Sequence, residues 1–225
     1  MADKLFFLPY SPDHQGIIFA RQEYGSGINN TGLNHMRKEI EHELFDKEHA
    51  NRPYALWYEP AVRNPFLASM NNGNILIRGH GMPGCKSIEG GRCGERVDYN
   101  VVVDRLVESG LSRQFNGRIK MFNCHSAEAA EPDGSPECVG TPFAQLMADE
   151  LSSRGYRSCT FFGYHGAIDS VPKMGPYGKH HYRRIIVRGR QAATGRASEV
   201  RQEFKSKSGV RSLRVFLHFP AFGRN

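Results

Sequence analysis

An apolar run that ends in histidine and glycine stands at residues 74–81, Asn74-Ile75-Leu76-Ile77-Arg78-Gly79-His80-Gly81. A second run ends in cysteine and stands at residues 118–126, Arg118-Ile119-Lys120-Met121-Phe122-Asn123-Cys124-His125-Ser126. Short apolar runs of this length predict buried strands, and residues 99–111 between them follow the helical period. A right-handed strand–helix–strand crossover makes the two strands parallel neighbours. Both carboxyl ends then lie at one edge of the sheet.

That edge is where open α/β sheets hold their ligands and carry out their chemistry. Adjacent strands are expected to deliver His80 and Cys124 there, and an imidazole beside a thiol can serve as the base of a cysteine nucleophile. Gly81 lacks a side chain, so its N–H can approach a substrate carbonyl and form an oxyanion hole with the N–H of Cys124. The sequence therefore predicts acyl transfer by Cys124, with His80 as general base and acid.

The rest of the chain alternates apolar segments with amphipathic ones. Strands are predicted at 4–9, 54–58, 159–164, 182–188 and 212–218, with a further strand or hairpin at 17–24, and helices at 33–49, 142–154 and 198–207. Asp98 and Thr141 are placed to cap helices, and Pro142 suits a first helical position. The long loops at 82–97 and 127–140 are typical of functional or mobile segments. We expect one α/β domain over residues 1–225, with a mostly parallel sheet covered on both faces.

The charge and the cysteine content of the chain indicate which cellular compartment and which binding partners to expect. The formal net charge is +7, and much of the excess lies in the last third of the chain. Such a surface attracts polyanions, although a solvated basic face is the simpler explanation, and no recognised motif indicates nucleic acid. No stretch has the roughly 18 apolar residues of a membrane span, and no signal peptide is predicted. Five irregularly spaced cysteines favour reduced thiols in a cytosol, either the producer's cytoplasm or a target cell into which the protein is delivered.

A zinc site is an alternative to the thiol–imidazole pair. Zinc favours Cys and His, which here are His80, Cys85, Cys93, Cys124, His125 and Cys138. Their separations are irregular, and no two cysteines have the two-residue spacing usual in zinc sites. We therefore expect no metal and no required cofactor.

The order of the two motifs resembles that of the caspase-like (clan CD) cysteine peptidases. The run from Ile75 to Gly81 matches their histidine motif, and the run from Ile119 to Ser126 matches their cysteine motif, although the caspase pentapeptide is absent. The resemblance implies a three-layer α/β fold with a mostly parallel central sheet flanked by helices. It also implies a cysteine endopeptidase acting on a protein or peptide. The chain is most similar to the cysteine protease domains of bacterial toxins and effectors, which implies inositol hexakisphosphate as an activator at the basic C-terminal third.

Three loop residues are candidates for substrate binding: Ser126, His165 and Asp169. His165 is also an alternative base, whereas His125 is secondary because neighbouring side chains of an extended chain point to opposite sides. Other functions stay open. The same dyad could deamidate or transamidate glutamine, or the fold could be a non-catalytic module that binds a polyanion. Cys124 could also be an inert core thiol and His80 a residue that merely ends a strand.

Overall fold

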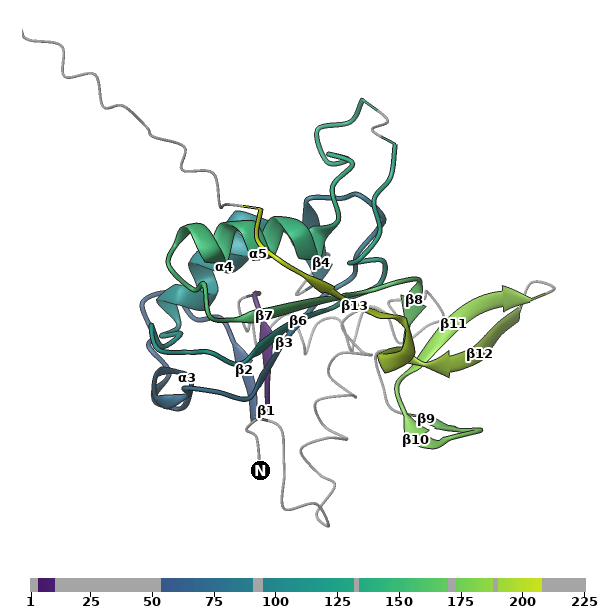
Figure 1. Cartoon of the computed structure of the whole chain (residues 1–225), viewed down its shortest axis with the longest axis horizontal. Helices are drawn as coiled ribbons and strands as arrows, with labels where there is room; N and C mark the ends of the chain where they lie inside the picture. The colour runs from purple at the N-terminus through teal and green to yellow at the C-terminus, as the bar shows by residue number, and fades with distance from the viewer. Residues whose placement is uncertain are drawn as a thin grey trace, which may run out of the picture.

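The computed structural model of this chain describes residues 4–10, 54–90, 95–131, 134–169, 173–187 and 190–207. Its centre is a six-stranded sheet with the order β13-β7-β6-β3-β1-β2 (Figure 1). The strands are β1 (Lys4–Leu8), β2 (Tyr54–Trp57), β3 (Asn74–Arg78), β6 (Arg118–Phe122), β7 (Thr160–Tyr164) and β13 (Arg201–Phe204). All neighbours pair in parallel except β13, which is antiparallel to β7. The prediction of an α/β fold with a mostly parallel sheet is confirmed.

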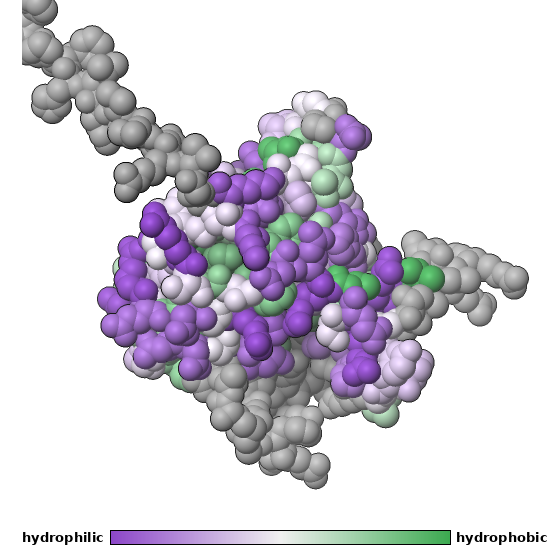
Figure 2. Space-filling model, in the orientation of Figure 1, coloured by the Kyte–Doolittle hydropathy of each residue, from purple (hydrophilic) through white to green (hydrophobic). Residues whose placement is uncertain are grey.

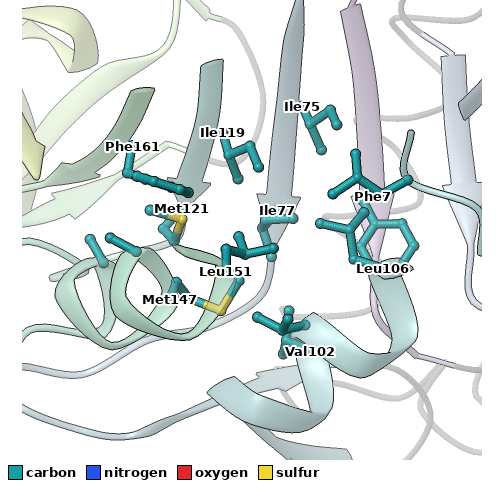
Figure 3. Packing of buried hydrophobic residues seen from close by; sticks show 14 of the residues in the cluster. Phe7, Ile75, Ile77, Val102, Leu106, Ile119, Met121, Met147, Leu151 and Phe161 are labelled. Atoms are coloured by element: carbon teal, nitrogen blue, oxygen red, sulfur yellow. The ribbon is translucent and has the colours of Figure 1, made fainter. Parts of the chain in front are cut away.

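Helices α4 (Tyr99–Glu108) and α5 (Phe143–Ser153) cover one face of this sheet (Figures 1 and 3). Alternate strand side chains point to this face, and they pack against the apolar side of each helix. Full burial of one such side chain contributes about 1.5–3 kcal/mol, so this layer fixes the register of β3 against β6. The labelled members in Figure 3 are Phe7, Ile75, Ile77, Val102, Leu106, Ile119, Met121, Met147, Leu151 and Phe161.

The opposite face of the sheet carries a smaller apolar cluster, against which Cys124 packs. The side chain of Arg78 is buried on this face, and its guanidinium lies 5.3 Å from the ring centre of Phe6 and 4.4 Å from that of Phe122. The cluster consists of Phe6, Leu76, Phe122, Tyr164, Ile168 and Ala197. Hydrophilic side chains dominate the outer surface of the molecule seen in Figure 2.

Smaller elements surround the central sheet. The short helix α3 (Pro65–Ser69) precedes β3, and β4 (Ser87–Gly90) and β5 (Glu95–Asp98) form an antiparallel pair. A three-stranded sheet contains β8 (Ala167–Ile168), β11 (Tyr182–Val187) and β12 (Arg190–Arg196), and a two-stranded one contains β9 (Lys173–Gly175) and β10 (Gly178–His180). No helix among the described residues is long and apolar enough to cross a membrane.

The structure corrects three sequence predictions. The helix expected at 198–207 is a single 3-10 turn, η2 (Ala197–Val200), followed by β13, which satisfies the backbone groups at the edge of β7. The stretch 82–97, expected to be a loop, contains β4 and β5. Pro142, expected at the first helical position, stands at the N-cap of α5 in place of Thr141. Asp98 stands at the N-cap of α4 as predicted, although its carboxylate makes no capping hydrogen bond and pairs with Lys86 at 3.1 Å. The segments predicted at 17–24, 33–49 and 212–218 lie outside the described residues.

Candidate active site

The histidine and cysteine motifs meet at the carboxyl edge of the sheet. Strands β3 and β6 pair up to Arg78 and Phe122, and His80 and Cys124 each stand two residues further on. Gly81 packs directly against the cysteine motif: a Cβ atom at Gly81 would lie 2.4 Å from the carbonyl oxygen of Cys124. Only a residue without a side chain fits so close an approach. The His80 ring makes no hydrogen bond to the Cys124 sulfur within the described part of the chain.

The Cys124 sulfur lies against the backbone of β8. The N–H of Ile168 points at this sulfur at 3.4 Å, and the carbonyl oxygen of Ile168 lies 3.7 Å from it. Burial raises the pKa of the Cys124 thiol above its usual value, while the Ile168 N–H and the charge of Arg78 act in the opposite direction. The net result is a thiol that stays protonated in the free protein at neutral pH.

His80 is held through its backbone and keeps an exposed surface. Its N–H donates to the carbonyl of Glu89 at 2.6 Å, and its own carbonyl accepts from the N–H of Glu89 at 2.9 Å. The surrounding protein still removes enough water to lower the pKa of the imidazole below its usual value, although the Glu89 carboxylate opposes this. The ring is therefore mostly neutral at pH 7 and can accept a proton.

These two pKa shifts predict the pH dependence of thiol reactivity. A raised thiol pKa and a lowered imidazole pKa disfavour a thiolate–imidazolium pair, so the thiolate fraction grows only as pH approaches the thiol pKa. We expect the alkylation rate of Cys124 by iodoacetamide to rise continuously from about pH 7 to above about pH 9. Peptide mass spectrometry measures the rate at Cys124 alone. A flat, high rate between about pH 5 and 7 would show a preformed ion pair instead.

The buried side chain of Ser126 holds the loop that carries Cys124 in place through two hydrogen bonds. This side chain is fully buried; its hydroxyl donates to the carbonyl of Met121 at 2.7 Å and accepts from the N–H of Tyr164 at 2.9 Å. Ser126 therefore braces the loop between β6 and β7. Direct contact of Ser126 with substrate stays a prediction.

The side chain of Glu128 also holds this loop in place, and this role was not predicted from the sequence. His125 adopts a left-handed φ of 59°, and its N–H donates to the carbonyl of Gly166 at 2.9 Å. Glu128 contacts His125 Nδ1 at 2.9 Å with one carboxylate oxygen and accepts the Gly166 N–H with the other. The three-residue spacing of His125 and Glu128 is the only sequence signal for this contact.

The other two residues predicted to bind substrate are His165, directly after β7, and Asp169, directly after β8. His165 Nε2 meets the side-chain oxygen of Gln202 at 2.7 Å. The Asp169 side chain is buried, and its carboxylate accepts from Arg184 Nε at 2.6 Å. Neither residue lines the cavity beside His80. A role in substrate binding stays a prediction for both.

The cavity beside His80 has a volume of about 570 Å³. Its described walls come from residues 82–89, 130–131 and 135–138, together with Arg96. Among the described lining residues, three carboxylates, Glu89, Glu131 and Glu137, stand against the one guanidinium of Arg96. With His80 neutral, the formal charge of this lining is −3 + 1 = −2. The sequence marked both loops as functional but did not show that their acidic residues converge.

A cluster of cations occupies the opposite face and rim of the sheet. The pKa of Lys120 on β6 falls to about 8 because of burial first and then the charges of Arg201, Arg118 and Lys4. Of these four residues, only Arg201 belongs to the last third of the chain, where the polyanion site was expected. Among the described residues, no group of three or more His, Cys, Asp or Glu side chains is arranged to hold a metal ion.

Comparisons with models of protein families, with curated proteins and with solved structures found no match to this chain. The case for a function therefore rests on the residues of the site.

Proposed function

We propose that this chain is a cysteine endopeptidase of the caspase-like (clan CD) kind, with Cys124 as nucleophile and His80 as general base and acid. The observation that carries the proposal is the contact of Gly81 with the Cys124 carbonyl, since it brings both motifs to one sheet edge. The three-layer caspase-like arrangement is part of the proposal; α4 and α5 would form one outer layer.

The backbone supplies the oxyanion hole in this proposal. The N–H groups of Gly81 and Cys124 donate to no oxygen of any described residue; that of Cys124 interacts with its own sulfur and would turn to the ligand oxygen in the proposed reaction. Two such donors aimed at a developing oxyanion stabilise it by several kcal/mol in acyl transfer.

The reaction begins with two neutral partners. His80 removes the thiol proton as the Cys124 sulfur bonds to the substrate carbonyl carbon, and the oxyanion is held by the two N–H groups. His80 then donates this proton to the departing amine, which breaks the peptide bond and leaves a thioester on Cys124. Water, deprotonated by His80, attacks the thioester and releases the acid. No cofactor is required for these steps.

The acidic cavity beside His80 sets the expected substrate preference. A lining of formal charge −2 favours a basic side chain and disfavours an acidic one, because unpaired like charges in a partly enclosed site are costly. We therefore expect cleavage next to lysine or arginine.

The cation cluster supports a polyanionic activator such as inositol hexakisphosphate. After burial, the charges of Arg201, Arg118 and Lys4 also lower the pKa of Lys120, and a bound phosphate group would relieve that part of the effect. The protein would then act in the cytoplasm, or in a target-cell cytosol, where such phosphates occur. A purely polyanion-binding module is the second candidate, and it rests on this same cluster.

A peptide library incubated with and without inositol hexakisphosphate tests these proposals together. We expect new peptide termini after lysine or arginine, at a higher rate with the phosphate, and none with Cys124→Ala. A gain of about one dalton at glutamine, without cleavage, would replace the peptidase by a deamidase. Phosphate binding that survives Cys124→Ala, with no change in any peptide, would favour the binding module.

A further inference from the structure

Cys85 and Cys138 face each other across two antiparallel segments beside the cavity. The residue after Cys85 donates its N–H to the carbonyl of the residue before Cys138 at 3.0 Å. The residue after Cys138 donates to the carbonyl of the residue before Cys85, also at 3.0 Å. This flanking pattern defines a non-hydrogen-bonded pair, in which the Cα atoms are about 4.5 Å apart and the side chains approach most closely.

The two thiols have the placement that a disulfide needs. A Cα separation of about 4.5 Å lies within the range of observed disulfides. Both side chains are on the same side of their segments, since both line the cavity beside His80. Neither cysteine is in a disulfide, and both are partly exposed to solvent, so a small oxidant can reach them.

The backbone fixes this pairing independently of the two sulfur atoms. Gly84 has a left-handed φ of 64° and packs so tightly on Ala130 that a Cβ atom would lie 2.8 Å from the Ala130 methyl carbon. Its N–H donates to the carbonyl of Glu128 at 2.9 Å. Ala130 in turn donates to the carbonyl of Gly140 at 3.3 Å. The two segments thus run side by side beyond the catalytic edge (Figure 1).

We propose that Cys85 and Cys138 form a reversible disulfide that locks the two walls of the cavity together. The oxidant is a low-molecular-weight disulfide such as oxidised glutathione. The thiolate of one cysteine attacks it, forming a mixed disulfide and releasing one small thiol. The thiolate of the other cysteine then attacks the protein sulfur and releases the second small thiol. Two protein thiols are oxidised by two electrons, and one small disulfide is reduced to two thiols.

The bond changes the cavity without touching the candidate nucleophile. It replaces the contact of the Cys138 sulfur with the carbonyl of Glu131, 3.6 Å away, and leaves the contacts of Cys124 with Ile168 in place. Joining residues 53 positions apart restricts the unfolded chain, so oxidation should raise Tm by about 5 °C or more. The disulfide should hold the two cavity walls in place before peptide binds. KM should then be lower, because the walls lose less conformational freedom on binding.

The test oxidises a Cys93→Ser/Cys124→Ala variant of the full chain with glutathione mixtures, followed by acid quenching, alkylation and peptide mass spectrometry. Cys93 lies outside the described residues and is replaced to remove an alternative partner. We expect a single cross-linked species that joins Cys85 to Cys138 and reverts on reduction. Cys85→Ser and Cys138→Ser on the same background serve as matched controls and should show neither the cross-link nor the Tm increase.

Separate glutathione adducts on the two cysteines under excess oxidised glutathione would overturn the proposal. A metal site would overturn it as well. In that case one equivalent of Zn²⁺ would protect both thiols from alkylation and prevent the cross-link. The KM effect alone rests on the proposed peptidase function and is measured with Cys93→Ser. A cross-link with a raised Tm but no peptidase activity would reject the function and keep the disulfide.

Discussion

Cys124→Ala is expected to lower kcat/KM for peptide cleavage by at least about 1,000-fold, because no other described thiol lies at the Gly81 contact. The fold should be kept. The Cys124 side chain packs at the margin of the smaller apolar cluster, so removing its sulfur should lower the free energy of unfolding by only about 1 kcal/mol. Initial rates on a lysine- or arginine-containing peptide, with Tm measured in parallel, check both expectations.

The matched control is Cys159→Ala, because Cys159 is also a partly buried thiol with a backbone contact. Its sulfur lies 3.3 Å from the carbonyl of Phe115, and burial raises the pKa of its thiol to about 12. This variant should keep full activity and full electrophile labelling of Cys124. Peptide cleavage that survives Cys124→Ala, or labelling of Cys124 no faster than of Cys159, would contradict the assignment of the nucleophile.

Gly81→Ala is expected to reduce kcat/KM on the order of 100-fold, as when an oxyanion donor is lost. The added methyl group would stand 2.4 Å from the carbonyl oxygen of Cys124 and 2.4 Å from the side-chain nitrogen of Asn123. Backbone has to move to relieve the first of these clashes, and the Gly81 N–H moves with it. Gly81 does not have a left-handed φ, so the effect comes from the methyl group and not from backbone strain.

Gly195→Ala on β12 is the matched glycine control. The added methyl group meets only the end of the exposed Glu199 side chain, at 2.7 Å, and moving this carboxylate disturbs only its exposed contacts with Arg196. Activity and Tm should both stay near those of the unchanged protein. If Gly81→Ala cleaves peptide as fast as Gly195→Ala, the close contact between the two motifs is not needed for the proposed chemistry.

The parallel core was predictable because its signal is local. Ile75, Ile77, Ile119 and Met121 lie in short apolar runs, and the helical period of 99–111 fixes the crossover between them. The contact of Gly81 with Cys124 follows from that crossover. Glycine after histidine suggested an N–H that could approach a substrate carbonyl, but the contact of Gly81 with the Cys124 carbonyl was not predicted.

The antiparallel elements could not be predicted in the same way. Residues 201–204 read Arg-Gln-Glu-Phe, which has no strand pattern, and they become β13 only because the edge of β7 offers backbone partners. The pairing of Cys85 with Cys138 and the convergence of Glu89, Glu131 and Glu137 depend on contacts between distant loops. Such contacts leave no periodicity in either segment.

Hydrogen bonds join the loop that carries Cys124 to the loop after β7, and they limit where the chain could change to alter its substrate range. Gly166 accepts the His125 N–H and donates to Glu128, so a change in the length of the 164–168 segment would displace the loop that carries Cys124. Among the described residues, those that line the cavity make no hydrogen bond to the Cys124 sulfur, which contacts Ile168 instead. Insertions and exchanges in these walls can therefore alter which peptides are accepted while the proposed bond-breaking geometry stays unchanged.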